Sequence, residues 1–391
     1  MTKPVAFPGF RRKNGGMGVR NHLLILPAVQ YANHAARQIA ALLPGSVTLE
    51  NAYGDAQMGS DAAQTRRTLA GFAAHPNVGA CLVLGLDGGQ SGGDYLAEAA
   101  ARAGTPVDYV NLSRFASPAE AVTRAVRLGS AMGRELARQG REICGIDELI
   151  LGLECGGSDS WSGLSANPVT GECSDLVIEH GGTAMLSETQ EMIGAEAFFA
   201  ARAKDPTLRE RFLQIVALRE QESIDGGVDI SSVNPSPGNK EGGLTTLEEK
   251  SLGCMQKGGT RAPLADVVEY AERPSKRGLV FMDTPGDDVE SITGMVAGGS
   301  QVCVFTTGRG TCVGCPVAPV IKVASNTPMF MRMRDNMDFD AGDVVLGNVT
   351  IENAGQDLFA LLLRVCGGEA TKSEILGCDG NFSVTRTGIT L

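Results

Sequence analysis

Short apolar runs that alternate with longer helical stretches are the feature of this sequence that most restricts its fold. The run at residues 22–28 is followed by a helical pattern at 33–43, and the run at 78–86 by a helical pattern that reaches residue 102. Such alternation predicts parallel strands, because a parallel pair needs a long crossover connection that is usually a helix. We therefore expect an α/β protein whose N-terminal part is a doubly wound parallel sheet.

The length of the chain indicates more than one domain. It has 391 residues, of which 43% are hydrophobic and 20% charged, so there is ample apolar material for two cores. The 51 glycines and the 5% aromatic content favour tight turns and close packing of helices on sheets. We place a boundary near residues 139–147, which gives an N-terminal α/β domain at 1–140 and a larger C-terminal α/β domain at 141–391.

The charge and the cysteines narrow the possible partners and the compartment. The net charge is −11 and lysines and arginines do not cluster, so nucleic acid and anionic membrane are poor partners. No apolar run has the length of a bilayer span, and the N-terminus lacks the form of a signal peptide. We predict a cytoplasmic protein whose ten cysteines are mostly reduced thiols.

Polar glycine turns follow several of the predicted strands. The apolar run at 148–153 ends in Glu154 and Cys155, and two glycines then lead to Ser158 and Asp159. Similar turns follow three later runs, with the polar residues Glu188, Asp283, Thr284, Thr307 and Arg309. Because the carboxyl ends of parallel strands meet at one edge of a sheet, we expect these groups to converge in one crevice. The alternative for a single turn is structural, with Ser158 or Asp159 as the N-cap of the following helix.

The residue types in these turns suit one class of reaction, which removes a proton next to a carboxylate and expels a β-substituent. The developing oxyanion needs positive charge, and the proton needs a base. Arg309 lies between two glycines and can bind a carboxylate bidentately. Lys257 and Lys322 are candidate bases or anion clamps; Lys257 serves as a base if its surroundings lower its pKa. The alternative for each lysine is a solvated surface charge.

Several cysteines lie where a metal could bind. Cys155 and Cys254 each lie at a glycine turn, and residues 312–315 form a C-x-x-C sequence. Thiolates suit iron, iron–sulfur clusters or zinc, but one C-x-x-C without a second pair is a weak zinc signal. The alternative is a set of reduced thiols.

Two other segments are candidates for binding. Residues 8–21 form a basic glycine-rich loop in which Arg12, Arg20 and Asn21 can clamp an anion, unless the loop is only a solvated turn. Residues 222–246 are rich in Gly, Pro, Ser and Asn, and a loop of that length is usually a lid or a mobile segment.

A series of motifs resembles the altronate/galactarate dehydratase family in order and spacing, over nearly the whole chain. These motifs are VRN (19–21), DAAQTRRTL (61–69), HPN (75–77), GLECGGSD (152–159), SANP (165–168), LSET (186–189), SLGCMQKGG (251–259), MDTPG (282–286), FTTGRG (305–310) and PVIKV (319–323).

The resemblance implies a lyase that converts a small hydroxy or sugar acid to a 2-keto acid. It implies that this lyase depends on ferrous iron, with an iron–sulfur cluster as the less favoured alternative. It also implies that the larger C-terminal domain has a fold particular to the family. On this hypothesis the catalytic residues are Lys257, Arg309, Asp159 and Lys322. The substrate-binding residues are Arg20, Asn21, Ser158, Asn167, Asp283 and Thr307. The metal ligands are Cys155, Cys254, Glu154 and Glu188.

The chain differs from the family pattern in two respects. Fused members begin with a small β-rich domain that is absent here, so we expect the split form, as in the (2R)-sulfolactate sulfo-lyases, with a separate small subunit and a homo-oligomer. Where the dehydratases usually carry His-Gly-Cys and Gly-Cys-Glu, this chain has YGDAQ (53–57) and LDGG (86–89). The loss of those thiol and imidazole groups leaves a second hypothesis open, a non-catalytic subunit that binds a sugar acid. Asp55 and Asp87 are the oxygen ligands that remain there.

Overall fold

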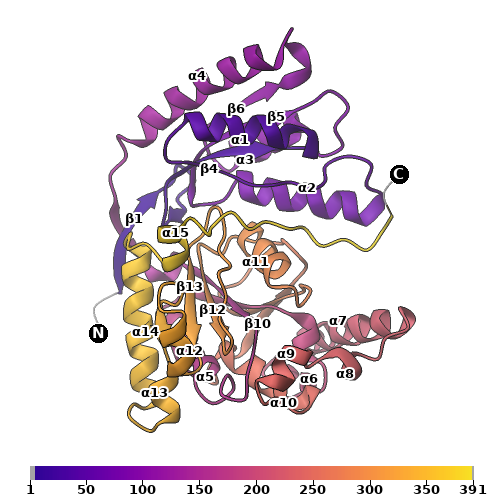
Figure 1. The fold of residues 1–391 in the computed structure, drawn as a ribbon, viewed down its shortest axis with the longest axis vertical. Helices are drawn as coiled ribbons and strands as arrows, with labels where there is room; N and C mark the ends of the chain where they lie inside the picture. Colours follow the sequence, from indigo (N-terminus) through magenta and orange to yellow (C-terminus); the bar gives the residue numbers. More distant parts are fainter. Residues whose placement is uncertain (1–4, 390–391) are drawn as a thin grey trace.

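The computed structural model describes residues 5–389 and shows two halves, each built on a parallel sheet with helices on both faces (Figure 1). The sheet of the N-terminal half has the order β4-β3-β5-β6, and all of its pairs are parallel. Its strands are β3 (His22–Pro27), β4 (Ser46–Thr48), β5 (Val78–Gly85) and β6 (Val107–Asn111). Its helices are α1 (Asn33–Leu42), α2 (Gly59–Ala73), α3 (Gly93–Arg102) and α4 (Pro118–Leu136). The predicted α/β fold class is confirmed.

The C-terminal half contains a seven-stranded parallel sheet in the order β10-β11-β9-β8-β12-β13-β14. Its strands are β8 (Ile150–Cys155), β9 (Thr183–Leu186), β10 (Leu264–Val268), β11 (Gly278–Met282), β12 (Val302–Thr307), β13 (Val320–Ala324) and β14 (Phe339–Asp340). The central strands are buried throughout, as expected for a parallel sheet that is covered on both faces. The first strand in sequence after β9, β10, ends at Val268 and is followed by a turn.

Helices on the two faces of this sheet join it to different neighbours. On one face, α5 (Ala166–Glu179) packs against α14 (Ile351–Cys366). On the other face, α11 (Asp288–Ala297) packs against α2 of the N-terminal half. The large sheet is therefore buried by its own helices on one side and by the junction with the other half on the other side.

The segment at 222–246 is more ordered than a long loop. It contains the end of α7 (Pro206–Asp225), then α8 (Ile230–Val233) and α9 (Pro237–Glu241), before α10 (Leu247–Cys254) begins. Ser236 and Asn239 form a reciprocal capping box at the start of α9. The prediction of a long loop at 222–246 is therefore wrong, because the segment contains short helices. Other short elements of the C-terminal half are η4 (Thr189–Met192), α6 (Glu196–Ala200), η5 (Met255–Gly258), α12 (Thr327–Arg332), α13 (Gly342–Val345) and α15 (Lys372–Leu376).

The N-terminal segment also differs from the expected basic loop. Residues of β1 (Ala6–Arg11) pair antiparallel with β2 (Met17–Gly18) and with β7 (Glu142–Gly145), which follows the N-terminal sheet domain in the sequence. The expectation of a loop over 8–21 overlooked this small sheet, because its strands are short and its main pairing partner lies far along the chain.

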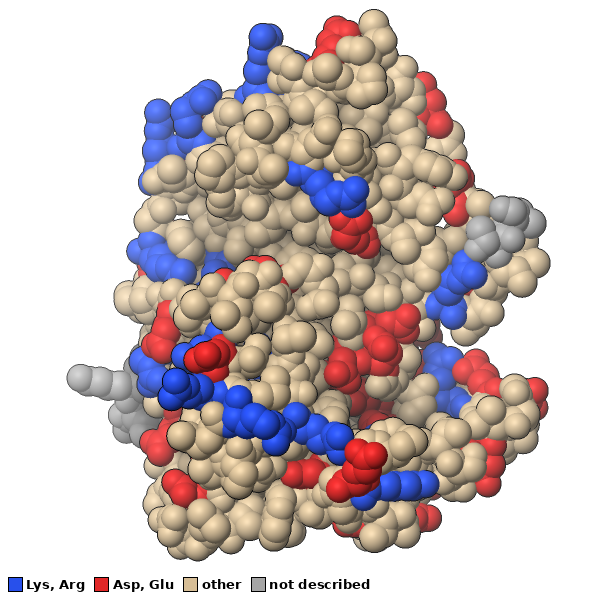
Figure 2. Space-filling model, in the orientation of Figure 1, with Lys and Arg blue, Asp and Glu red and all other residues tan. Residues whose placement is uncertain are grey.

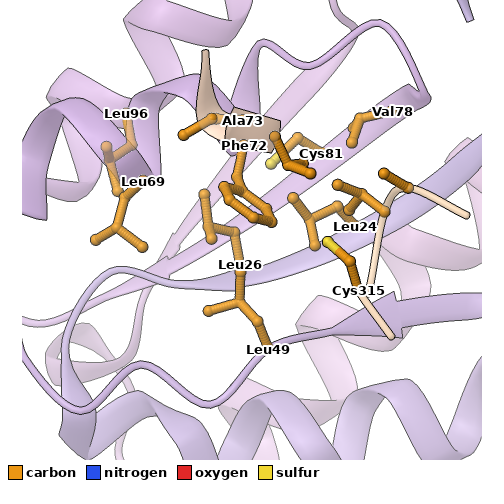
Figure 3. Packing of buried hydrophobic residues seen from close by; sticks show 14 of the residues in the cluster. Leu24, Leu26, Leu49, Leu69, Phe72, Ala73, Val78, Cys81, Leu96 and Cys315 are labelled. Atoms are coloured by element: carbon orange, nitrogen blue, oxygen red, sulfur yellow. The ribbon is translucent and has the colours of Figure 1, made fainter. Parts of the chain in front are cut away.

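The two halves share a continuous core. Asn77 donates hydrogen bonds to the carbonyls of Gln301 and Val317, both at 2.8 Å. Cys315, from the C-terminal half, packs with Leu24 and its neighbours in the N-terminal half (Figure 3). The C-terminal tail, yellow in Figure 1, runs beside the N-terminal half. No helix within residues 5–389 is both long and apolar enough to cross a membrane.

Candidate active site

Acids, thiols and a lysine meet at the carboxyl edge of the large sheet. Glu154 and Cys155 end β8, Glu188 follows β9, and Cys254 and Lys257 come from α10 and η5. All five are buried, with at most 4% of any of them exposed. The expected convergence of strand-end groups is confirmed for these residues, because parallel strands that lie side by side present their carboxyl ends together.

The two thiols and Glu188 form the centre of this cluster. The Sγ atoms of Cys155 and Cys254 are 3.3 Å apart, and the Glu188 carboxylate accepts the Cys155 N–H at 3.0 Å. Glu188 has a φ of +69°, in the left-handed region, which costs about 1–3 kcal/mol for a residue with a side chain. A hydrogen bond of 2.8 Å from the Glu188 N–H to Thr284 Oγ1 helps to hold it there. Strain of this kind is concentrated at functional sites.

Lys257 is a buried cation paired with Glu188. Burial by itself would lower the pKa of Lys257, but Cys155, Glu188, Cys254 and Glu154 together raise that pKa well above its ordinary value. The lowered pKa on which a base role depends is therefore not found. A fixed positive charge in a site that excludes water is suited instead to stabilising an oxyanion.

Glu154 points to the opposite face of the sheet edge, towards α11. It accepts hydrogen bonds from Ser291 Oγ at 2.5 Å and Ser187 Oγ at 3.2 Å, through its Oε2. Its Oε1 is buried and has no hydrogen-bond partner. Burial and then the charge of Glu188 raise the pKa of Glu154 well above its usual range, which favours the protonated form of this carboxyl.

A second buried ion pair lies beside the thiols. Lys250 Nζ is 2.8 Å from Glu191 Oε1, and Cys254 Sγ is 3.5 Å from Glu191 Oε2. Lys250 also donates to the side-chain oxygens of Asn234 and Asn239, at 2.8 and 3.1 Å, which brings α9 over the cluster. The sequence reasoning missed this pair, although Glu191 lies two residues after the LSET motif and Lys250 directly precedes SLGCMQKGG.

Asp288, at the start of α11, was also missed. Its side chain is half-buried beside Gly156, where a Cβ would overlap the Asp288 carboxyl. Burial and then the charge of Glu188 raise the pKa of Asp288 to about 7. The available signal was the pair of aspartates at a predicted helix start, but such pairs are common because they favour the helix dipole.

Asp159 and Arg309 lie in the wall next to the cluster. They line a cavity of about 510 Å³ together with Trp161, Asn326 and Arg332. Asp159 accepts hydrogen bonds from Ser162, Ser325 and Asn326, whereas Arg309 binds the carbonyl of Gly238 and the carboxylate of Glu241. Figure 2 shows a row of Lys and Arg side chains across the lower half of the molecule, a distribution that favours an approaching anion.

Ser158 and Asn167 line a smaller cavity, of about 250 Å³, that is also lined by Lys250 and Cys254. Asn167 accepts the hydroxyl of Thr306 at 2.6 Å and donates to the carbonyl of Gly253 at 3.0 Å. These contacts tie α5 to β12 and α10. The predicted binding residues Ser158 and Asn167 are therefore next to the thiol pair.

Asp283 and Thr307 have structural partners near the same edge. Arg219 binds both oxygens of the Asp283 carboxylate, at 3.1 and 2.7 Å, and Thr189 donates to one of them. Thr307 Oγ1 accepts the N–H of Gly310 at 3.0 Å, which closes the turn after β12. Asp283 and Thr307 can therefore contact a substrate only while they also keep these protein partners.

The structure does not bring the remaining predicted residues to the cluster. Arg20 forms an ion pair with Glu374 at 2.7 Å, and Asn21 accepts from Arg12 at 2.7 Å, so both fasten the N-terminal segment. Lys322 is fully buried on β13, level with Glu154 but separated from it by Phe305 on β12. Burial lowers the pKa of Lys322.

The donor set has the right kinds of atom for iron. Thiolates and carboxylates are suitable ligands, and Cys155 Sγ lies 3.7 Å from Glu188 Oε1. Among residues 5–389, however, no group of three or more His, Cys, Asp or Glu side chains is arranged to hold a metal ion. Glu188 and Glu191 are each paired with a lysine.

Two family models match the chain. The model described as D-galactarate/altronate dehydratase, C-terminal, covers residues 146–390, and the one described as D-galactarate dehydratase/altronate hydrolase, second domain, covers residues 9–137. These matches confirm the resemblance drawn from the motifs.

Characterised relatives include enzymes of two kinds. The chain is 36% identical to (2R)-sulfolactate sulfo-lyase subunit beta from Chromohalobacter salexigens over 97% of each protein. It is 36% identical to altronate dehydratase from Bacillus subtilis over 98% of this chain and 78% of that enzyme. It is 42% identical to galactarate dehydratase (L-threo-forming) from Escherichia coli over 60% of this chain and 45% of that enzyme.

Proposed function

Because this chain belongs to the galactarate/altronate dehydratase family, we propose that it is a lyase that eliminates a β-substituent from a small 2-hydroxy or sugar acid and yields a 2-keto acid. The observation that carries the proposal is the buried Lys257 ammonium, held by Glu188 within a cluster that also contains Glu154, an acid whose pKa is raised. A cation and a proton donor at one edge are what an elimination needs, since one carbon loses a proton while its neighbour loses a leaving group.

Each group has a separate task in this proposal. Lys257 stabilises the negative charge that develops when the α-proton is removed. Glu154 gives its proton to the leaving group, and its unpartnered Oε1 is the atom that is free to make this contact. Arg309, from the neighbouring cavity, binds the carboxylate of the substrate, with Asp159, Ser158 and Asn167 around it.

We also propose that Cys155 and Cys254, with Glu188, hold ferrous iron. When bound, the ion would supply a Lewis acid for an oxygen of the substrate. The support is the pair of adjacent thiols and the iron dependence that the family resemblance implies. Iron measured in the protein purified without oxygen should be stoichiometric, and Cys155→Ser should lose it; a protein that takes up no iron would contradict this part.

Two leaving groups are open, water and sulfite. The match with the sulfo-lyase subunit covers 97% of both chains, whereas the Bacillus altronate dehydratase is longer than this chain. Because the sulfo-lyase relative is named as a subunit beta, this favours a two-subunit enzyme with a separate partner subunit. We propose such a partner, and a cytoplasmic homo-oligomer of the pair, which the mass of the reconstituted complex would test.

The deciding experiment is a substrate screen. The chain, with its small partner and ferrous iron, is offered altronate, galactarate, tartrates and sulfolactate, and 2-keto acid and sulfite are measured. We expect keto acid from one of these acids, with sulfite only if the leaving group is sulfonate. Binding of a sugar acid without turnover would favour the non-catalytic alternative, whose motivation is the altered sequence at 53–57 and 86–89.

A further inference from the structure

Asp288 lies beside the cluster, against the turn that follows Cys155, and its side chain does not cap its helix. It is the first residue of α11, but the cap of that helix is Asp287, whose side chain accepts the N–H groups of Val289 and Glu290, both at 3.1 Å. The Asp288 carboxyl instead packs on the main chain of Gly156, directly after Cys155. A side chain at position 156 would displace this carboxyl.

The Asp288 carboxyl is next to the reacting groups but is not held by any of them. Within residues 5–389, it takes part in no hydrogen bond or ion pair, and only burial and more distant charges shift its pKa. Ser291 is one turn further along the same face of α11 and donates to Glu154, so Asp288 and Glu154 lie on the same side of the sheet edge. Asp288 itself contributes to the raised pKa of Glu154. Figure 2 shows acidic side chains gathered near the junction of the two halves.

We propose that Asp288 is the base that removes the proton from the carbon next to the substrate carboxylate. The inference rests on the proposed elimination and assigns the step that Lys257, as a fixed cation, does not perform. Three features carry it: a partly buried carboxyl, close contact with the glycine turn that leads to Asp159, and the absence of a hydrogen-bond partner within the described part of the chain.

The electrostatic surroundings fit this role. The charged groups that face Asp288 are Glu188, Asp287, Lys257 and Lys250; the first two raise its pKa and the two lysines lower it. With burial, the net result is a pKa of about 7. A base works best when its pKa is near the working pH, and two carboxyls with different environments divide the roles of base and acid.

The proton balance of the step is complete. Asp288 takes the α-proton as the C–H bond breaks, and those electrons form the carbon–carbon double bond. The bond from the β-carbon to oxygen or sulfur breaks, and Glu154 protonates the leaving group. The enol becomes the 2-keto acid by moving its hydroxyl proton to carbon through solvent. Asp288 then returns its proton, and Glu154 regains one, so no oxidant or reductant is needed.

The test is Asp288→Asn in the complete complex, with the acid that the native enzyme converts. We expect kcat to fall by a factor of about 10²–10⁴, with a much smaller change in KM. Exchange of the substrate α-proton with D₂O should be lost as well. The native profile of kcat/KM against pH should decline on the acid side below about pH 7, since the base must be ionised, and Asp288→Glu should restore part of the rate.

Glu290→Gln is the matched control, because Glu290 lies in the same first turn of α11 but contacts Ser383 rather than the cluster. It should keep the native rate and pH profile. Native rates and native proton exchange in Asp288→Asn would overturn the inference and leave the elimination intact. If the native complex released no keto acid from any acid in the panel, the proposed function would fail, and the role of Asp288 with it.

Discussion

Lys257 and Lys322 are both fully buried in the C-terminal half, yet their surroundings shift their pKa values in opposite directions. Lys257 is paired with Glu188 and faces two thiols and Glu154, and its pKa is raised. Lys322 has no ion pair among the described residues; its Nζ is 3.5 Å from the carbonyl of Val313, and burial lowers its pKa.

The comparison shows that neighbours, rather than burial, decide what a buried lysine can do. Lys257 carries a permanent charge at the edge where strand ends converge, which is useful only if negative charge develops nearby. Lys322 is at the same level of the sheet, beyond Phe305, where Asp338 and other acidic groups raise its pKa too little to outweigh burial. If this difference is real, substitutions at the two lysines should have opposite effects on stability.

The largest effect on stability is expected from Lys257→Met. This change leaves Glu188 buried without its partner, so the free energy of unfolding should fall by about 3–5 kcal/mol. The double variant Lys257→Met/Glu188→Gln removes both charges and should recover much of the loss. Urea unfolding of the native protein and both variants measures this, and an unchanged free energy in the single variant would show that the pair is not buried as described.

Lys322→Met should change the free energy of unfolding in the opposite direction. An ammonium with one long hydrogen bond is costly to bury, so its replacement should raise the free energy of unfolding by about 1–2 kcal/mol at pH 7. The lowered pKa means that the folded protein binds fewer protons than the unfolded chain between that value and about 10.4. Native stability should therefore rise with pH in this window, and the variant should lack the rise.

Asp288→Asn should stabilise the protein while it removes activity. The folded pKa of Asp288 is about 7, and the unfolded value is about 3.9, so the folded state binds more protons between these values. Stability from this group is thus lost as the pH rises from about 4 to 7. At pH 8 the variant should be more stable by about 1 kcal/mol, after allowance for solvent screening. A less stable variant would indicate a structural role instead.

The smallest effect on stability is expected in the N-terminal half, where amide side chains form hydrogen bonds between the polar turns. Gln90 bonds the N–H and the carbonyl of Gln57, at 2.8 and 2.9 Å. Gln90→Ala should cost about 1 kcal/mol of stability and leave turnover unchanged. A large loss of turnover at native stability would mean that these turns belong to the active site.

Much of the site could be predicted from the sequence because it depends on strand ends. Glu154, Cys155 and Glu188 follow apolar runs directly, and parallel pairing places such ends together. Cys254 and Lys257 were found by their motif, since nothing in their local pattern shows that η5 packs against α5.

Other features depended on contacts between distant parts of the chain. Arg20 resembled an anion clamp until Glu374, 354 residues away, proved to be its partner. Asp288 could be assigned to the site only from the structure, in which its carboxyl at the start of α11 packs on Gly156. The direction in which the pKa of Lys257 is shifted could not be predicted either, because it depends on four acidic neighbours from three separate segments.

The most direct test of the central claim compares the turnover of Lys257→Met and Lys322→Met in the reconstituted complex. The account predicts that Lys257→Met loses a factor of about 10³ in kcat, and that Lys257→Met/Glu188→Gln, shown to be folded by circular dichroism, is equally inactive. Lys322→Met should stay within about tenfold of the native rate, an effect too small for a group at the reacting atoms. Turnover that survives the loss of Lys257 but not that of Lys322 would contradict the account.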